Sequence, residues 1–263
     1  MTTGFIWNER YMWHDNGSAI GVHPPKGAFQ PGIHLENAET KRKLKNLLDA
    51  YGVTPQLKSL EHEMASDETL ERFHTPEYIG LVQQLSDGSG GDAGESALIG
   101  SGSAEIAKLA VGGTCSAVTA VCKGEINNAY ALTRPPGHHA ERDKGRGFCI
   151  FNNIGLAIMQ AQADKLVNRV AVIDWDVHHG NGTEAISVLE RLIELDPGNA
   201  DAQKLLQALP NCSVEEINLA GTGCSSELQA RFKAVCLWNM VARVATDDPE
   251  LTHINWMYKH ADD

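Results

Sequence analysis

Hydrophobic and polar positions along residues 1–186 alternate between short apolar runs and longer segments with helical spacing. The apolar runs predict strands at 4–7, 127–137 and 168–179. The third run is rich in Val and Ile, which is typical of a parallel strand covered on both faces. Apolar residues at helical spacing, or mostly apolar segments of helical length, predict helices between the runs. These helices are expected at 37–52, 75–85, 104–122 and 151–166.

Two of the predicted helices carry start signals. Asn37 can cap the first helix, whose leucines share one face, and Gly52 ends it. Thr75 can cap the second, with Pro76 at the first helical position, where proline is favoured. In the third helix, the adjacent Gly112 and Gly113 permit close packing.

The order of these elements predicts an α/β fold with a mostly parallel sheet flanked by helices. In such sheets ligands sit outside the carboxyl ends of the strands. Two polar clusters, at 134–153 and 174–184, follow two predicted strands at that edge. The Gly/Ser-rich segment 86–103 has the composition of a flexible linker between domains.

The alternation of strand-like and helix-like segments ends after Ile186. Residues 187–210 have helical apolar spacing, and "LDPGNADAQKLL" resembles the junction between tetratricopeptide-type repeats. A single repeat cannot bury its own apolar face. The segment around 227–245 is helix-like. We therefore expect 1–186 to form an α/β domain and 187–263 to form a divergent, mainly helical tail that completes it or binds a protein partner.

Composition narrows the function classes. The formal net charge of −12 argues against nucleic acid as the main partner and weakly favours cationic ligands. The six cysteines form no CxxC pair, as expected for reduced thiols. The N-terminus lacks the features of a signal peptide, and no apolar run approaches the roughly 18 residues of a membrane helix. We expect a cytoplasmic protein with no membrane partner.

The "DWDVHH" cluster offers metal ligands. On a strand, a period of two places Asp174, Asp176 and His178 on one face. A carboxylate and an imidazole at a rigid strand end are good zinc ligands, and Asp174 can support them from behind. The following "GNG" predicts a tight turn that lets a substrate approach the backbone. Alternatively, the aspartates cap the next helix and the histidines lie at the surface.

The second cluster places His138 and His139 behind Pro135, Pro136 and Gly137. The prolines stiffen the turn, and a rigidly held histidine suits general acid and base catalysis. A structural histidine pair is the alternative interpretation. One helix separates the two clusters along the chain, and together they favour a metal-assisted hydrolase.

The motifs "AYALTRPPGHHA", "GFCIFNN" and "VAVIDWDVHHGNGTE" resemble the zinc-dependent histone deacetylase superfamily, in its class II and bacterial amidohydrolase branch. The resemblance extends more weakly through "FHTPEYI", "GGDAGE" and "EIAKLAVGG" and covers about residues 1–186. It implies hydrolysis of an acetyl-lysine peptide or an acetylpolyamine-like substrate. It also implies a bound Zn²⁺ and a K⁺ near the strand that carries "DWDVH".

The resemblance implies roles for individual residues. His138 and His139 correspond to the tandem catalytic histidines, with His139 preferred as general base. Asp174 supports His138, and Asn181 supports His139. Asp176 and His178 correspond to zinc ligands. The positions that line the substrate channel or its rim are Gly147, Phe148 with Cys149 beside it, and Asp92, whose rim role replaces the linker interpretation of its loop.

Parts of the family pattern are missing after Glu184. The "GFDAH"-like aspartate that is the third zinc ligand, the "GGY"-like oxyanion tyrosine and the "SLH" strand have no counterpart. Nothing in their surroundings supports the alternatives, which are Asp196, Asp201, Asp247, Asp248 and Tyr258. Two hypotheses follow. The chain is a zinc-dependent deacetylase completed by its tail or a second chain, or it is an inactive deacetylase-fold protein that acts as a binding module.

Overall fold

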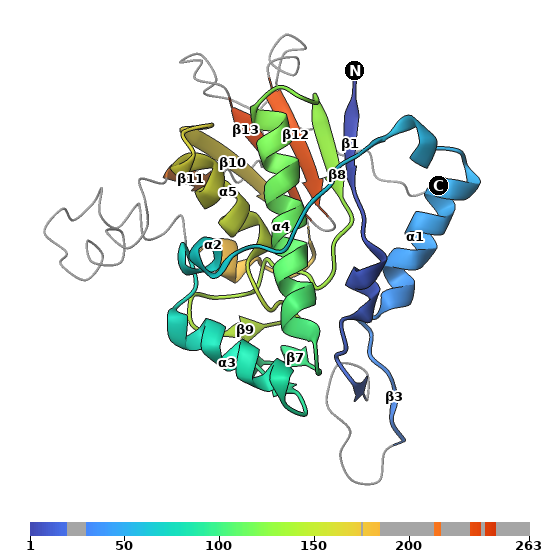
Figure 1. The fold of residues 1–263 in the computed structure, drawn as a ribbon, viewed down its shortest axis with the longest axis vertical. Coiled ribbons are helices and arrows are strands. Elements are labelled where there is room, and N and C mark those ends of the chain that lie inside the picture. The colour runs from blue at the N-terminus through green and yellow to red at the C-terminus, as the bar shows by residue number, and fades with distance from the viewer. Residues whose placement is uncertain (20–29, 175, 185–212, 217–231, 238–239, 246–263) are drawn as a thin grey trace, which may run out of the picture.

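A computed structural model describes residues 1–19, 30–174, 176–184, 213–216, 232–237 and 240–245. Its centre is a sheet with helices across it, as the sequence predicts (Figure 1). The sheet order is β11-β10-β13-β12-β8-β1-β4. The strands are β1 (Thr3–Ile6), β4 (Lys58–Ser59), β8 (Asn128–Ala131), β10 (Arg169–Asp174), β11 (Ser213–Glu216), β12 (Phe232–Leu237) and β13 (Met240–Ala245).

Most pairings in this sheet are parallel. β1 pairs in parallel with β4 and β8, β8 with β12, and β10 with β11. β13 runs antiparallel to both β10 and β12. Two antiparallel steps restore the direction, so β8 and β10 point the same way. Their carboxyl ends lie at one edge of the sheet, where the two polar clusters begin.

The helices and short strands complete the described fold. The helices are α1 (Ala38–Ala50), α2 (Asp67–Glu71), α3 (Pro76–Asp87), α4 (Ser103–Cys122) and α5 (Asn153–Ala163), with 3-10 helices η1 (Glu9–Trp13) and η2 (Thr54–Gln56). The short strands are β2 (Ser18–Ala19), β3 (Gly32–Ile33), β5 (Gly91–Asp92), β6 (Gly94–Glu95), β7 (Leu98–Ile99) and β9 (Gly145–Arg146).

The predicted helix starts are confirmed. The Asn37 side chain accepts the N–H of Glu39, and the Thr75 side chain accepts that of Tyr78. Each cap satisfies a backbone donor that the first turn of a helix leaves open. Gly52, just past α1, adopts a φ of +66°, which suits glycine at the end of a helix.

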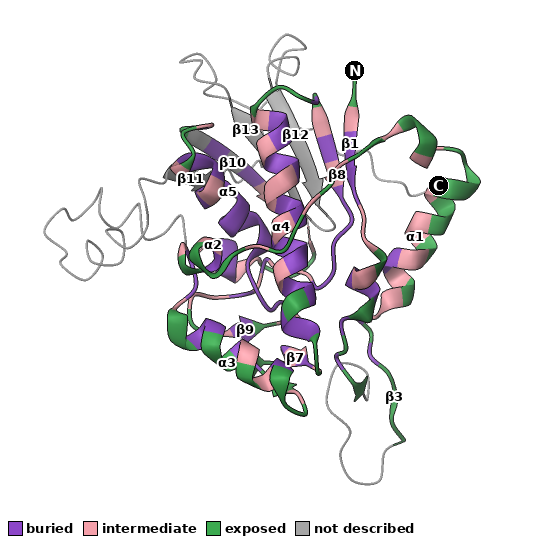
Figure 2. Cartoon of the chain, in the orientation of Figure 1, coloured by how far each residue is buried: buried purple, intermediate pink, exposed green. Residues whose placement is uncertain are grey.

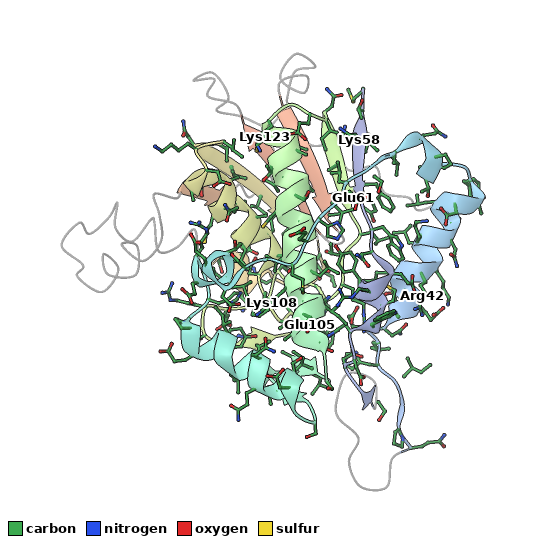
Figure 3. The ribbon with its side chains drawn as sticks, viewed as in Figure 1. Arg42, Lys58, Glu61, Glu105, Lys108 and Lys123 are labelled. Carbon is green, nitrogen blue, oxygen red and sulfur yellow. The ribbon has the colours of Figure 1, made fainter. Side chains whose placement is uncertain are left out.

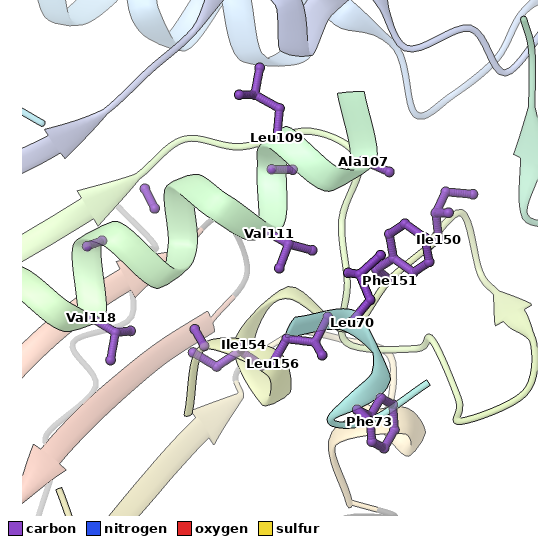
Figure 4. Close-up of a cluster of buried hydrophobic side chains, with 14 of the residues drawn as sticks. Leu70, Phe73, Ala107, Leu109, Val111, Val118, Ile150, Phe151, Ile154 and Leu156 are labelled. Carbon is purple, nitrogen blue, oxygen red and sulfur yellow. The ribbon is translucent and has the colours of Figure 1, made fainter. Parts of the chain in front are cut away.

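Helix α4 is the centre of the hydrophobic core. It packs against α5 and against the sheet, and most of its residues are buried (Figure 2). Val111 and Val118 on α4 face the cluster that contains Leu70 and Ile154 (Figure 4). A Cβ on Gly112 would meet the backbone oxygen of Glu63, which confirms the predicted close packing. By length and composition α4 could cross a membrane, but most of it is buried inside this fold.

Ion pairs tie the outer helices to the centre. Arg42 on α1 donates from Nε to Glu9 of η1 over 2.8 Å (Figure 3). Lys108 on α4 lies 2.8 Å from a carboxylate oxygen of Asp67 at the start of α2. These carboxylates are more than half exposed, so each pair contributes at most about 1 kcal/mol. These surface pairs therefore contribute little to the stability of the fold.

Two segments differ from their predictions. The segment 86–103 is no flexible linker: it forms the end of α3, then β5, β6 and β7, and leads into α4 at the buried Ser103. The helix predicted around 227–245 is wrong at β12 and β13, because short apolar runs rich in valine suit strands as well as helices. The tetratricopeptide-like segment 187–210 lies outside the described residues, and the domain boundary at 186 stays a prediction.

A buried histidine makes stability depend on pH. His74 is fully buried among Phe73, Tyr78 and Phe151, and its Nε2 accepts the N–H of Asn152 over 3.0 Å. Burial lowers the pKa of His74 from 6.5 to about 3. Between these values the unfolded chain binds a proton that the folded chain excludes. The contribution of neutral His74 to the stability of the fold is therefore complete above the pKa of the unfolded chain. It declines as the pH falls below that pKa.

We expect the free energy of unfolding to fall by about 1.4 kcal/mol per pH unit through His74 between pH values of about 6 and about 4. Urea unfolding at several pH values measures this slope. His74→Gln keeps an acceptor for the Asn152 N–H and should flatten the slope by that amount. Equal slopes in wild type and His74→Gln would contradict the assignment.

Candidate functional site

The two polar clusters meet beyond the carboxyl ends of β8 and β10. The turn 134–140 follows β8, and the segment 174–184 follows β10. Gly182 and Thr183 both donate their backbone N–H to the carbonyl of His138, over 3.1 and 3.2 Å. Backbone hydrogen bonds thus hold the second cluster directly against the first.

His138 is buried and held from behind. Its Nδ1 lies 2.7 Å from Oδ2 of Asp174, the last residue of β10. The other oxygen of Asp174 accepts the backbone N–H of Asp176 over 3.1 Å. The imidazole is therefore fixed through Nδ1, and Nε2 is left for chemistry. This is the pairing predicted for these two residues.

His139 lies beside His138, with ring centres 4.0 Å apart. Its Nδ1 is 2.8 Å from Oδ1 of Asn181, the predicted partner. Burial lowers the pKa of His139, and the charges of His138 and His178 lower it further, although the hydrogen bond from His139 to Asn181 raises it. A half-buried imidazole with a lowered pKa is neutral near pH 7 and can accept a proton.

Asp176 and His178 also lie side by side, but not through strand periodicity. β10 ends at Asp174, and the chain bends at 177–178, so that part of the sequence prediction is wrong. Oδ1 of Asp176 accepts the backbone N–H of His178 over 2.8 Å and lies 2.9 Å from its Nδ1. Such local side-chain bonds to the backbone end strands. Burial raises the pKa of Asp176, but the hydrogen bonds from His178 outweigh this and lower it.

The carboxylate and imidazole of this pair fit two positions of a zinc site. The His178 ring lies 6.0 Å from that of His139, beside the tandem histidines, and its side chain is largely exposed. Within the described ranges, no third His, Cys, Asp or Glu joins them in a metal-binding group. The described residues thus supply two of the ligands of a zinc site. A complete site would need a third donor from outside the described residues or from a second chain.

The predicted channel residues border His139. A Cβ on Gly147 would meet the His139 ring, so glycine is required there by close approach, and its φ is +51°. Phe148 is half-buried at a φ of +70° and packs edge-on against His34, with ring centres 4.8 Å apart. Cys149 is buried, and burial raises the pKa of its thiol far above the usual range. Gly147 and Cys149 thus contact His139, and a substrate channel along 147–149 stays a prediction.

Asp92 lies in a loop that pairs with the segment 147–148. Its carboxylate accepts the backbone N–H groups of Gly94, Ser96 and Ala97 over 2.9–3.1 Å. The N–H groups of Gly147 and Phe148 in turn donate to the carbonyls of Glu95 and Ser96, each over 3.0 Å. Asp92 is exposed and shapes the loop beside the site. A contact with substrate stays a prediction.

The glycines of the "GNG" turn lie where the two clusters come into contact. A Cβ on Gly180 would meet Oδ2 of Asp174 and would lie 3.2 Å from Nδ1 of His138. A Cβ on Gly182 would meet the backbone oxygen of Ala140. The glycines let the two clusters approach one another, and the approach of a substrate to this turn stays a prediction.

We expect Gly180→Ala to destabilise the fold by about 1–3 kcal/mol, because the new methyl group overpacks the His138–Asp174 contact. Chemical unfolding measures the change. Gly80→Ala on α3 is the matched control: beyond its own helix backbone, a methyl group there would have no atom within 4 Å, and alanine should stabilise a helix by about 0.5–1 kcal/mol. Equal stability of Gly180→Ala and wild type would contradict the tight contact.

Sequence reasoning missed the buried ion pair beneath the turn. Arg134 donates from Nε to both oxygens of Glu36 over 3.0 Å and from Nη1 to the carbonyl of His14 over 2.6 Å. Lys41 also lies 2.9 Å from Glu36, and the two cations lower the pKa of that carboxyl to about 2 despite its burial. The position of Arg134 directly before Pro-Pro-Gly-His-His was the available signal.

The fold and site define an α/β protein with a tandem-histidine site at the strand ends. The chain belongs to the histone deacetylase domain family, whose model matches residues 34–192, more than half of it.

Individual relatives agree with this assignment. The chain is 49% identical over 187 residues to a histone deacetylase-like amidohydrolase from Pseudomonas aeruginosa, covering 70% of this chain and 49% of that protein. It is 35% identical over 194 residues to a human polyamine deacetylase, HDAC10, covering 69% of this chain and 28% of that one. The crystal structure of the HDA15 HD domain matches with a TM-score of 0.62 at 30% identity, covering 71% and 50% of the two chains. The chain thus spans about half the length of the bacterial relative.

Proposed function

We propose that this protein hydrolyses acetyl-lysine or a related N-acyl amine, with zinc as cofactor. The observation that carries the proposal is the orientation of the tandem histidines: Asp174 and Asn181 hold both Nδ1 atoms, and the rings lie beside the Asp176–His178 pair. Family membership and the amidohydrolase relative support the same reaction class.

The residues of the chain have distinct roles in this proposal. His139, whose pKa is lowered, takes a proton from the attacking water through Nε2. His138, held by Asp174, donates a proton to the leaving amine. Gly147 and Phe148 line the path of the acyl-lysine stem beside His139. The products are acetate and a free amine.

Asp176 and His178 would hold the zinc ion, together with a third donor from outside the described residues or from a second chain. When bound, zinc polarises the acyl carbonyl and lowers the pKa of its water. The oxyanion donor, like the third ligand, has no assigned residue. A potassium ion near 174–178 is a further prediction from the resemblance.

The substrate is expected to be cationic or to contain lysine. The net charge of −12 and the exposed Asp92 beside the site favour a positively charged partner. An acetylated polyamine is positively charged at its remaining amines. A relative of this chain carries the name polyamine deacetylase. A cytoplasmic location accords with the dispersed cysteines.

A second function has one specific observation in its favour. The described residues hold no third metal donor beside Asp176 and His178. An inactive deacetylase-fold protein that binds a protein partner would need none. This alternative predicts a folded chain that neither retains zinc nor releases acetate.

Acetate release distinguishes the two functions. The full chain is loaded with zinc and incubated with an acetyl-lysine peptide, an acetylated polyamine and a neutral acylamide. We expect hydrolysis of the acetyl-lysine peptide and the acetylated polyamine, loss of the activity with a chelator and recovery on adding zinc. Absence of acetate from every substrate would overturn the proposal and favour the binding module. Equal rates on all three would contradict the charge preference alone.

A further inference from the structure

A chain of polar contacts runs from the protein surface to His139 through Glu141. Oε1 of Glu141 accepts from Nδ2 of Asn181 over 2.7 Å, and Oδ1 of Asn181 faces Nδ1 of His139 over 2.8 Å. Sequence reasoning did not single out Glu141. It is three-quarters buried and follows the tandem histidines by two positions.

The contacts of Asn181 permit only one orientation of its amide. The amide nitrogen carries two donors, and the amide oxygen only accepts. The nitrogen faces the Glu141 carboxylate and, at 3.5 Å, the backbone carbonyl of His139. Both groups only accept, so a flipped amide would set oxygen against oxygen. The amide oxygen therefore faces His139.

This orientation determines where His139 carries its proton. Since Oδ1 of Asn181 accepts, Nδ1 of neutral His139 must be the donor, and Nε2 then holds the free lone pair. A base at Nε2 needs that tautomer. The opposite amide orientation would place a donor at Nδ1 and leave Nε2 protonated.

Surface cations hold the Glu141 carboxylate in place. Nη1 of Arg146 donates to Oε1 of Glu141 over 2.8 Å, and Lys144 lies 3.5 Å from Oε2. Glu95 on the neighbouring loop contacts the same two cations, at 2.7 Å from Lys144 and 3.2 Å from Arg146. The side-chain amide of Asn181 donates to Glu141 and not to Glu95, so Glu95 provides a matched control.

We propose that Glu141 is a positioning residue that fixes the tautomer of His139 by orienting the amide of Asn181. The inference rests on the proposed function for its catalytic consequence. The tautomer itself is a property of the chain and can be observed without turnover.

The test is ¹⁵N NMR of the full chain labelled at histidine, at a pH of about 8, where an ordinary imidazole is neutral. His139 is assigned from the spectrum of His139→Gln. In wild type we expect a protonated-type shift at Nδ1 and a lone-pair-type shift at Nε2. Glu141→Ala should move both shifts toward a mixture of tautomers, and Glu95→Ala should leave them in place. Unchanged His139 shifts in Glu141→Ala would overturn the inference, whether or not the chain is active.

Kinetics provides the second readout. Glu141→Ala should lower kcat by about 10- to 100-fold with little change in KM, as for other residues that orient a catalytic group. The effect should disappear in an Asn181→Ala background, because Glu141 acts only through that amide. Equal losses from Glu141→Ala in both backgrounds would show a general structural role and overturn the inference. A wild type without activity would refute the proposed function but leave the NMR test intact.

Discussion

Replacing His139 by alanine is expected to lower kcat for an acetyl-lysine peptide by about 10²- to 10⁴-fold, the usual contribution of a general base. The variant loses the imidazole whose Nδ1 lies 2.8 Å from Oδ1 of Asn181. Zinc should remain bound, because His139 is not a proposed ligand. Steady-state kinetics and metal content, measured on the same preparation, check both statements.

His179→Ala is the control for this experiment. His179 is also one of two adjacent histidines, but it is largely exposed and contacts Glu184 at the surface. The control should retain wild-type kinetics. An active His139→Ala, or equal losses in the two variants, would remove His139 from the role of general base.

Arg134→Met is expected to reduce the free energy of unfolding by about 3–5 kcal/mol, the usual cost of breaking a buried ion pair. The change keeps a long side chain but leaves the buried Glu36 with one cation and the carbonyl of His14 without its donor. Arg134 also leads directly into the Pro-Pro turn of the tandem histidines. Urea unfolding by circular dichroism measures the change.

Arg10→Met breaks an exposed ion pair, with Glu105, and should cost less than about 1 kcal/mol. The contrast between the two arginine variants isolates the effect of burial. A similar small loss in both would mean that the Arg134–Glu36 pair contributes little to stability.

The sequence predicted the elements whose signals are local. The caps at Asn37 and Thr75 determine helix starts through contacts two or three residues away, and both helices begin as expected. The Val- and Ile-rich strand that ends at Asp174 was also recognisable. Because parallel strands end at one edge, the meeting of the two histidine-containing clusters could be predicted from strand direction alone.

The long-range polar contacts that hold the tandem histidines and their turn in place could not be predicted in this way. Glu36 and Arg134 are 98 residues apart, and Glu141 and Asn181 are 40 apart. A single long-range pair of polar side chains has no periodicity, so nothing in the pattern marks its partner. The proximity of Asp176 and His178 was predicted for the wrong reason: β10 has already ended at Asp174, and the Asp176 carboxylate accepts the backbone N–H of His178 where the chain bends.

The central claim is that Asp176 and His178 hold a catalytic zinc ion beside the tandem histidines. Its most direct test is the zinc content of the purified full chain after dialysis, by elemental mass spectrometry, with His178→Ala alongside. We predict about one zinc per chain, as in other catalytic zinc sites, and loss of the metal in the variant. No retained zinc in the wild type, or equal zinc in both proteins, would contradict the account.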